Sequence, residues 1–138
     1  MSTSSKAPMG ATDDEKVAAY LTLDQIRKVP DLEPEDVHVP QWKGKVRVRP
    51  FSMRERQAVR KAAEYRQMDE DTGQLVTQYD SEEMEIEAVI QGCIEPRFSR
   101  ADKVWLREEK SSGAITRIAT KIFALSGMGR DAEGKQES

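Results

Sequence analysis

Chemically reactive side chains are scarce in this sequence. Its 138 residues include one cysteine, Cys93, and one histidine, His38. A disulfide within the chain is therefore excluded, and a structural zinc site, which takes about four Cys or His ligands, cannot be assembled. A catalytic triad needs its histidine to contact a nucleophile and an acid, but His38 falls in a predicted strand close to a proline. We expect no catalytic residues, no metal and no cofactor, and a protein that is not an enzyme.

Long apolar runs are also lacking. No run approaches the roughly 18 residues of a membrane-spanning helix, and residues 1–16 lack the apolar core of a secretory signal peptide. The single cysteine fits a reducing, intracellular compartment. The net charge of −3 argues against a dedicated DNA-coating protein, which is usually basic. With 37% hydrophobic and 34% charged residues, the chain suits one modest core, over 20–127, between flexible arms at 1–19 and 128–138.

Several stretches resemble motifs for ligand binding or catalysis, but each lacks a feature that the motif requires. The segment DEDTG, from Asp69, has its glycine at the fifth position, whereas an EF-hand loop needs it at the sixth. The segment SGMG lacks the Lys-Ser/Thr ending of a phosphate-binding loop. The glutamates from Glu82 to Glu87 spread around a predicted helix, which favours a solvated face over an acid–base pair. Cys93 falls on an apolar helical face, where we expect an inert core thiol.

A β-hairpin is the clearest element of the first half. Two short runs have valine at alternate positions, and the connection PQWKG between them contains a proline and a glycine. This pattern predicts a hairpin near 36–50 with its valines inside and Lys45, Arg47 and Arg49 outside. Because an isolated hairpin is marginal in water, the valine face must pack on the helices that follow.

Helices account for most of the remainder. Thr22 with Gln25, and Ser52 with Glu55, have capping-box spacing. The second box begins a helix expected to run from Met53 to about Gln67. Gly73 marks a turn between two short segments. An extended conformation is one option for these segments.

Three further helices follow. Asp80 or Ser81 caps the first, which carries Ile86, Val89, Ile90 and Cys93 on one face and ends before Pro96. Ser99 caps the second, with Ala101, Val104 and Trp105 on one side. Ser111 or Ser112 caps the last, whose apolar stripe is Ile115, Ile118, Ala119, Ile122 and Leu125, with Gly127 as its stop. The fold class is mainly α with a small β-hairpin (α+β), a compact bundle of short helices.

Charge is segregated along the chain. Residues 43–66 contain nine basic and two acidic side chains, whereas residues 69–95 contain nine acidic and no basic ones. The basic row could contact phosphates, with Trp42 stacking on a base. No known nucleic-acid-binding motif surrounds it, which favours a solvated face, or neutralisation of the acidic block if the helices pack antiparallel. The stripe of the last helix suits core packing, or insertion into the groove of a partner.

Three stretches together point to a family. The first is VHVPQWKGKVRVRPFSMRER (37–56), a Val-Pro-x-Trp strand, a turn, a second valine strand and a capped, charged helix. The second is IQGCIEPRFS (90–99), an apolar helix ending at an acidic residue and a proline. The third is DKVWLREEKSSGAITRIATKIFALSGMG (102–129). In their content, order and spacing they resemble the tail assembly chaperones of long-tailed phages, over roughly residues 37 to 129.

This resemblance implies a mostly helical, non-catalytic interaction protein. Such chaperones bind and solubilise the tape-measure protein, help recruit tail-tube subunits and are typically absent from the finished virion. The implied location is the bacterial host cytoplasm. Many members also have a longer form made by ribosomal frameshifting, and this sequence would be the shorter one. Glu133 to Lys135 can be encoded as the slippery run GAG-GGA-AAG, so a gene without such a run would contradict a frameshift here.

Two hypotheses follow. The first is a tail assembly chaperone with no membrane association, and with homo-oligomer formation left open. The alternative is a small nucleic-acid-binding protein that uses the basic hairpin and the following helix. Candidate partner-binding residues come from the hairpin, the start of the next helix and the last helix: Trp42, Arg47, Arg49, Arg54, Ile118, Ile122 and Leu125.

Overall fold

The computed structural model describes residues 19–128. The chain divides between Asp31 and Leu32 into two compact units. The described part of the first unit holds α2 (Leu23–Lys28), whose capping box of Thr22 and Gln25 forms as predicted. No residue of α2 is buried. The sequence prediction grouped this helix with a domain over 20–127, whereas the second unit begins at Leu32. The predicted flexible arms at 1–19 and 128–138 lie almost wholly outside the described residues.

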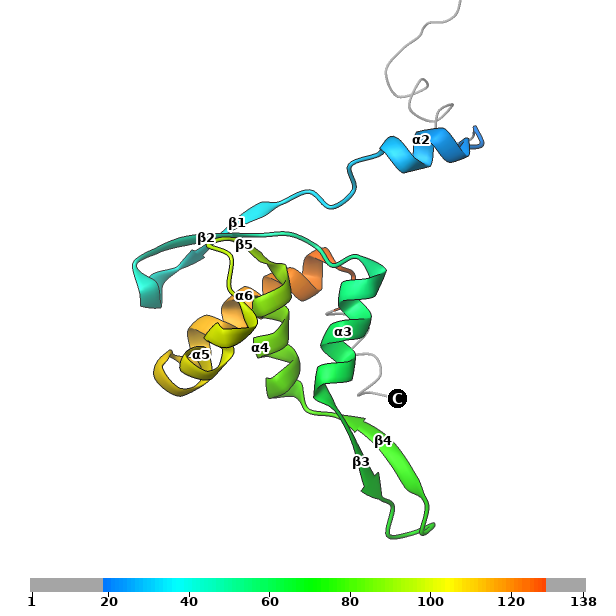
Figure 1. Cartoon of the computed structure of the whole chain (residues 1–138), viewed down its shortest axis with the longest axis vertical. Coiled ribbons are helices and arrows are strands. Elements are labelled where there is room, and N and C mark those ends of the chain that lie inside the picture. The colour runs from blue at the N-terminus through cyan, green and yellow to red at the C-terminus, as the bar shows by residue number, and fades with distance from the viewer. Residues whose placement is uncertain (1–18, 129–138) are drawn as a thin grey trace, which may run out of the picture. The chain divides into compact units, whose positions relative to one another are not determined.

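The second unit combines helices with two small antiparallel sheets (Figure 1). Its elements in order are β1 (Glu35–Val39), η1 (Pro40–Trp42), β2 (Gly44–Val48), α3 (Met53–Ala63), β3 (Glu64–Met68), β4 (Leu75–Tyr79), α4 (Ser81–Gly92), β5 (Cys93–Glu95), η2 (Arg100–Asp102), α5 (Lys103–Glu109) and α6 (Ser112–Leu125). The predicted α+β fold class, mainly helical, is confirmed. Among residues 19–128, no helix has the length and apolar character needed to cross a membrane.

The predicted hairpin is present as β1 and β2, joined by the single turn η1. Val37 pairs with Val46 in the antiparallel register, and all four hairpin valines are buried. His38 lies on the exposed side. Alternation along each strand therefore separates a core face from a solvent face, as the valine spacing indicated.

A third strand, β5, extends this sheet in the order β1-β2-β5. Val48 pairs with Cys93, and Arg47 pairs with Glu95. The sequence prediction placed Cys93 in the preceding helix, which was wrong, because α4 ends at Gly92 and Cys93 is already extended. Proline at position 96 disfavours helical geometry in the residue before it, so an extended Glu95 is the physical expectation.

The core forms around α4. This helix packs on α3, α5 and α6, while α6 also contacts the three-stranded sheet. Because neighbours surround it, α4 is buried continuously from Ile86 to Ile90 and not only along one stripe. The predicted stripe of α6 is confirmed as core from Ile115 to Ile122, and Leu125 is half-buried.

The ends of α6 follow from its sequence. The Ser111 side chain accepts a hydrogen bond from the N–H of Ala114 at the start of the helix. At the other end Gly127 adopts a positive φ of 73°. There the Met128 N–H donates to the Phe123 carbonyl at 2.8 Å. A residue without a Cβ is favoured in this left-handed position, so the predicted glycine stop is confirmed.

Two details of the other helices differ from the prediction. Helix α3 ends at Ala63, not near Gln67, and the chain continues as the β3–β4 hairpin. Gly73 makes the turn with a φ of 74°. On α5 the buried side chain is Leu106, whereas Val104 is 66% exposed. The turn η2 precedes α5 and changes which residues face the core.

Close packing of α4 on α6 generates a testable requirement for glycine at position 92. A Cβ added there would lie 2.7 Å from Cδ1 and 2.9 Å from Cγ2 of Ile122. We expect Gly92→Ala to lower the free energy of unfolding by about 1–3 kcal/mol through overpacking. Denaturant unfolding measures this difference.

The matched control is Ile122→Val, which removes Cδ1 and alone costs about 0.5–1.5 kcal/mol. In that background Gly92→Ala should cost less than in the natural chain, because the closest clashing atom is gone. Equal costs in both backgrounds would contradict the packing explanation.

Candidate functional site

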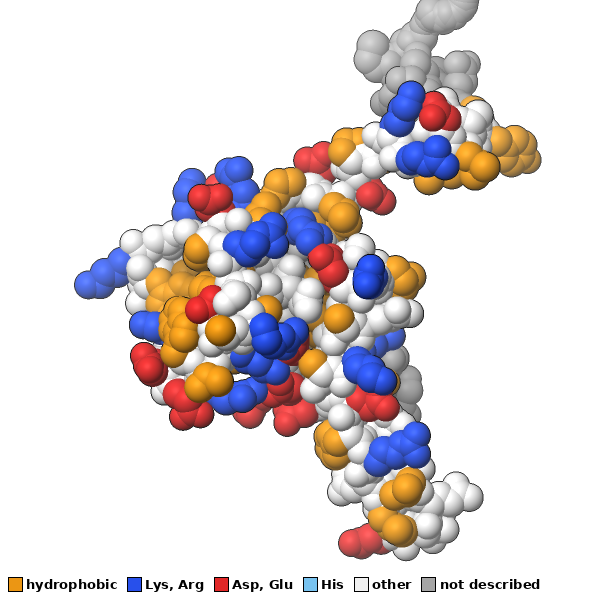
Figure 2. Space-filling model, in the orientation of Figure 1, with side chains coloured by type: hydrophobic (Ala, Val, Ile, Leu, Met, Phe, Trp, Pro, Cys, Tyr) orange, Lys and Arg blue, Asp and Glu red, His pale blue; other side chains and the backbone are white. Residues whose placement is uncertain are grey.

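An open apolar groove of about 280 Å³ lies on the second unit, between η1 and α5. In Figure 2, hydrophobic side chains gather on the surface between these elements. Five lining residues come from the first hairpin and its turn, two from the segment after β5, and two from α5 and the residue that follows it. They are Val39, Trp42, Gly44, Lys45, Val46, Pro96, Phe98, Trp105 and Lys110.

Aromatic rings form the walls of the groove. Trp42, in the single turn η1, is half-buried and packs against the core. Phe98 and Trp105 meet edge to face with their ring centroids 6.2 Å apart and their planes at 64°. The indole N–H of Trp105 donates to the Asp102 carboxylate at 2.8 Å, which fixes the orientation of the exposed ring. Buried valines, Val39 and Val46, complete the lining.

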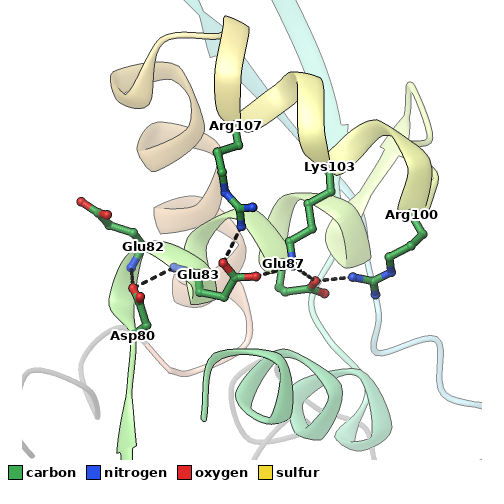
Figure 3. Close-up of polar contacts among 7 residues, drawn as sticks. All are labelled: Asp80, Glu82, Glu83, Glu87, Arg100, Lys103 and Arg107. Carbon is green, nitrogen blue, oxygen red and sulfur yellow. Dashed lines mark hydrogen bonds and ion pairs between the residues drawn. The ribbon is translucent and has the colours of Figure 1, made fainter. Parts of the chain in front are cut away.

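The wall that α5 provides depends on polar contacts with α4 as well as on packing. Leu106 is the buried residue of this seven-residue helix. Figure 3 shows the contacts beside it: Glu83 and Glu87 of α4 point toward three cations of the η2–α5 segment. Lys103 bridges both carboxylates, Arg100 pairs with Glu87, and Arg107 pairs with Glu83. This ion-pair network positions the helix that carries Trp105.

Glu87 is the charged residue at the centre of this network. It is fully buried, and its Oε2 accepts a hydrogen bond from Lys103 at 2.7 Å and another from Arg100. Burial alone would raise the pKa of Glu87. The hydrogen bonds from Arg100 and Lys103 outweigh burial and hold the pKa below its ordinary value of 4.5. The carboxylate is therefore ionised at neutral pH, and it attracts the cations of α5.

The groove combines an apolar lining with two cationic side chains. Its lining is apolar except for the two lysines, Lys45 and Lys110, which suits an aliphatic or aromatic side chain with an acidic neighbour.

Within residues 19–128 no three His, Cys, Asp or Glu side chains lie close enough to hold a metal ion. Burial raises the pKa of the Cys93 thiol to about 12, so the predicted inert core thiol has this structural basis.

Three of the nine cations in the predicted basic row form ion pairs with carboxylates. Arg47 donates to Asp36 at 2.9 Å, and Lys45 lies 3.2 Å from the same carboxylate. Arg49 forms a half-buried pair with Glu55. Arg54, on α3, is exposed and pairs with no carboxylate among residues 19–128. The candidate residues Arg47, Arg49 and Arg54 therefore do not form one row of free cations.

The candidates on the last helix lie elsewhere. Ile118 and Ile122 are 0% exposed and belong to the core of this chain, so they cannot reach a partner in this conformation. Leu125 is half-buried and packs against the same core. Of the seven candidate residues, Trp42 alone lines the groove.

The two charge blocks do not neutralise each other as the sequence suggested. The acidic residues of α4 pair with cations of η2 and α5, not with α3. Glu87 also contradicts the expectation of a solvated glutamate face. It stands within an apolar run, between Ile86 and Ala88, and that setting was the available signal for a buried charge.

Beyond the first hairpin, which contains the candidate Trp42, sequence reasoning missed four groove residues: Pro96, Phe98, Trp105 and Lys110. Phe98 and Trp105 come from segments on either side of η2, and no periodic pattern relates them. The available signal was the aromatic content itself, since aromatics make up 6% of the chain and two of them fall within eight residues. Strand β5 pairs with β2, and the segment after β5 contributes Pro96 and Phe98 to the groove that Trp42 lines.

No family model, no curated protein and no solved structure matches this chain.

The buried carboxylate generates a stability prediction. We expect Glu87→Gln to lower the free energy of unfolding at pH 7 by roughly 1.5–3 kcal/mol, because charge-assisted hydrogen bonds are lost. A carboxyl whose folded pKa is depressed stabilises above its unfolded pKa, near 4.5, and loses this contribution as the pH falls through the folded pKa. The difference between variant and natural chain should therefore shrink below about pH 4.5.

Urea unfolding at a series of pH values measures this difference. The control is Glu82→Gln, on the same helix, where the side chain is exposed. A pH-independent difference for Glu87→Gln, or an equal effect of Glu82→Gln, would contradict the assigned role of the Glu87 carboxylate.

Proposed function

We propose that this protein is a phage tail assembly chaperone that binds and solubilises the tape-measure protein and helps to recruit tail-tube subunits. One observation carries the proposal. Every residue that lines the apolar groove belongs to one of the three stretches on which the resemblance rests: 37–56, 90–99 and 102–129. Segments that are far apart in the sequence thus contribute to one apolar surface, which suits the apolar side chains of a protein client.

The groove suits weak, repeated binding of apolar helices. Burying one side chain the size of leucine or phenylalanine contributes about 1.5–3 kcal/mol, which is one to two factors of ten in affinity. One groove of about 280 Å³ holds only a few such groups. A long client with many apolar segments would then be covered by many copies, each of which can leave as tube subunits arrive.

Charge adds selectivity at the rim. Lys45 and Lys110 line the mouth of the groove, and both are exposed. Acidic residues beside the inserted apolar side chain would pair with them, while basic neighbours would be repelled. The proposed site of action is the cytoplasm of the bacterial host, with the chaperone absent from the mature virion.

Co-expression with the tape-measure protein of the same phage tests this function. We expect the natural chain to raise the soluble yield of that client and to co-purify with it. Trp42→Ala and Trp105→Ala should each lower the co-purified amount by about tenfold or more, because each removes an aromatic wall. Tyr20→Ala is the control, since Tyr20 is 98% exposed and lies in the first unit.

Circular dichroism establishes that each variant is folded. Lys110→Glu provides a second test that leaves the core untouched, and it should weaken binding and alter its salt dependence. The proposal fails if the natural chain gives no gain in client solubility and no co-purification. It also fails if folded groove variants bind as well as Tyr20→Ala.

A small nucleic-acid-binding protein remains the second candidate function. It is favoured by the α3 cations Arg54, Arg60 and Lys61, which pair with no carboxylate among the described residues. Phosphate contacts predict binding that weakens steeply with salt. For a chaperone we expect no such binding in a filter assay. Steep salt-dependent binding that is lost in the Arg54→Ala, Arg60→Ala, Lys61→Ala triple variant would favour nucleic acid instead.

A further inference from the structure

The β3–β4 hairpin, here called the arm (64–79), projects from the end of α3 away from the helices (Figure 1). It forms a two-stranded sheet of its own. No residue in either strand is buried, and four large apolar side chains are about half exposed: Tyr65 at 47%, Met68 at 55%, Leu75 at 57% and Tyr79 at 45%. Figure 2 shows hydrophobic side chains on this projection.

Such a hairpin needs a partner. An isolated two-stranded hairpin is marginally stable in water, and a third strand or a helix is normally required to cover it. Both outer edges of the arm also leave backbone groups unpaired. Within the described residues, α3 leads into one strand and α4 follows the other, but neither covers the arm along its length. Among residues 32–128 no segment supplies the missing cover, which leaves this surface for a partner.

Charge indicates what that cover is. The turn of the arm carries three acids and no cation: Asp69, Glu70 and Asp71. The neighbouring helix α3 carries four cations, and none pairs with a carboxylate within residues 19–128: Arg54, Arg56, Arg60 and Lys61. Figure 2 shows basic side chains along this helix. The chain therefore presents two complementary surfaces that its own geometry holds apart.

The lengths of the two surfaces match. An 11-residue helix is about 16 Å long, and a five-residue strand is about 17 Å long. Strand β3 starts where α3 ends, so the arm leads away from the helix and its acidic turn cannot fold back onto it. Two copies can be related by a two-fold axis that passes near their α3–β3 junctions. In that arrangement the arm of each copy lies antiparallel along α3 of the other copy.

The outer face of α3 suits this contact. Its exposed residues include Met53, Ala58 and Ala62 beside the cations. Alanines allow a sheet to approach closely, and Met53 offers an adaptable apolar contact. Met68, Leu75 and Tyr79 share one face of the arm, because Met68 pairs with Leu75 and Tyr79 lies four residues beyond Leu75 on the same strand.

We propose that two copies of this chain form a reciprocal two-fold dimer. The arm of each copy covers α3 of the other. The dimer therefore contains two equivalent contacts between an acidic arm turn and a basic α3 helix. A two-fold interface is self-complementary, so both contacts form together or not at all. This dimer uses neither Trp42 nor Trp105 and does not depend on the client of the groove.

Exchange of charges between the two surfaces tests the dimer. The turn variant carries Asp69→Lys, Glu70→Lys and Asp71→Lys, and the helix variant carries Arg54→Glu, Arg60→Glu and Lys61→Glu. Each variant alone faces like charges in both contacts and should be monomeric by light scattering after gel filtration. A mixture of the two should form a mixed dimer, because opposite charges meet in both contacts. The natural chain should be dimeric.

Matched controls change equal charge at exposed residues outside both surfaces. They are Glu33→Lys with Glu108→Lys and Glu109→Lys, and Arg27→Glu with Arg97→Glu and Arg117→Glu. Both controls should stay dimeric. The natural dimer should weaken between 0.1 M and 1 M salt, where the Debye length falls from about 10 Å to about 3 Å.

The proposal is overturned by a natural chain that stays monomeric across a concentration series at about 0.1 M salt. It is also overturned by an assembly larger than two copies, or by single variants that still dimerise. A mixture of folded variants that fails to associate would overturn it too. Loss of nucleic-acid binding in the helix variant, with no change of mass, would assign the cations to nucleic acid instead.

Discussion

The ion pair between the buried Glu87 carboxylate and Lys103 holds together the part of the structure on which the proposed function depends. Helix α5 has one buried side chain, Leu106, so packing alone would fix it weakly. Glu87 and Glu83 together hold three cations of the η2–α5 segment. That attachment places Phe98 and Trp105 opposite Trp42. Without it the first hairpin and α4 would persist, but the groove would lose one wall.

A buried charge is a costly way to attach a helix. Desolvating a carboxylate costs several kcal/mol, and a well-packed apolar contact would stabilise as much or more. One oxygen, Glu87 Oε1, has no hydrogen-bond partner among residues 19–128, which adds to that cost. An ion pair has one advantage over an apolar contact, because it accepts a single register of α5 on α4. The orientation of Trp105 on α5 is set locally, because its indole N–H donates to Asp102 three residues earlier. The register of α5 on α4 then fixes where this ring lies relative to the first hairpin.

Local signals in the sequence predicted the local structure well. The valine alternation, the serine and aspartate caps, the Gly127 stop and the stripe from Ile115 to Ile122 all correspond to observed features, because each depends on neighbouring residues. The errors involve distant partners. Cys93 becomes a strand residue because Val48 offers it a sheet edge. Residues 64–68 leave the helical pattern because residues 75–79 pair with them. The groove requires three distant segments at once, and no local pattern encodes their meeting.

The segregated charges show again that a local pattern does not identify distant partners. Two adjacent blocks of opposite sign suggest neutralisation within the chain, but the carboxylates of α4 are taken by η2 and α5. The cations of α3 and the acids of the arm turn are then left over on surfaces that point away from each other. Exposed, separated and opposite charges suit contact between two copies, and the proposed dimer would bring them together. The proposed dimer uses α3 and the arm and does not use the groove between η1 and α5, so the two proposals, self-association and client binding, are compatible on one molecule.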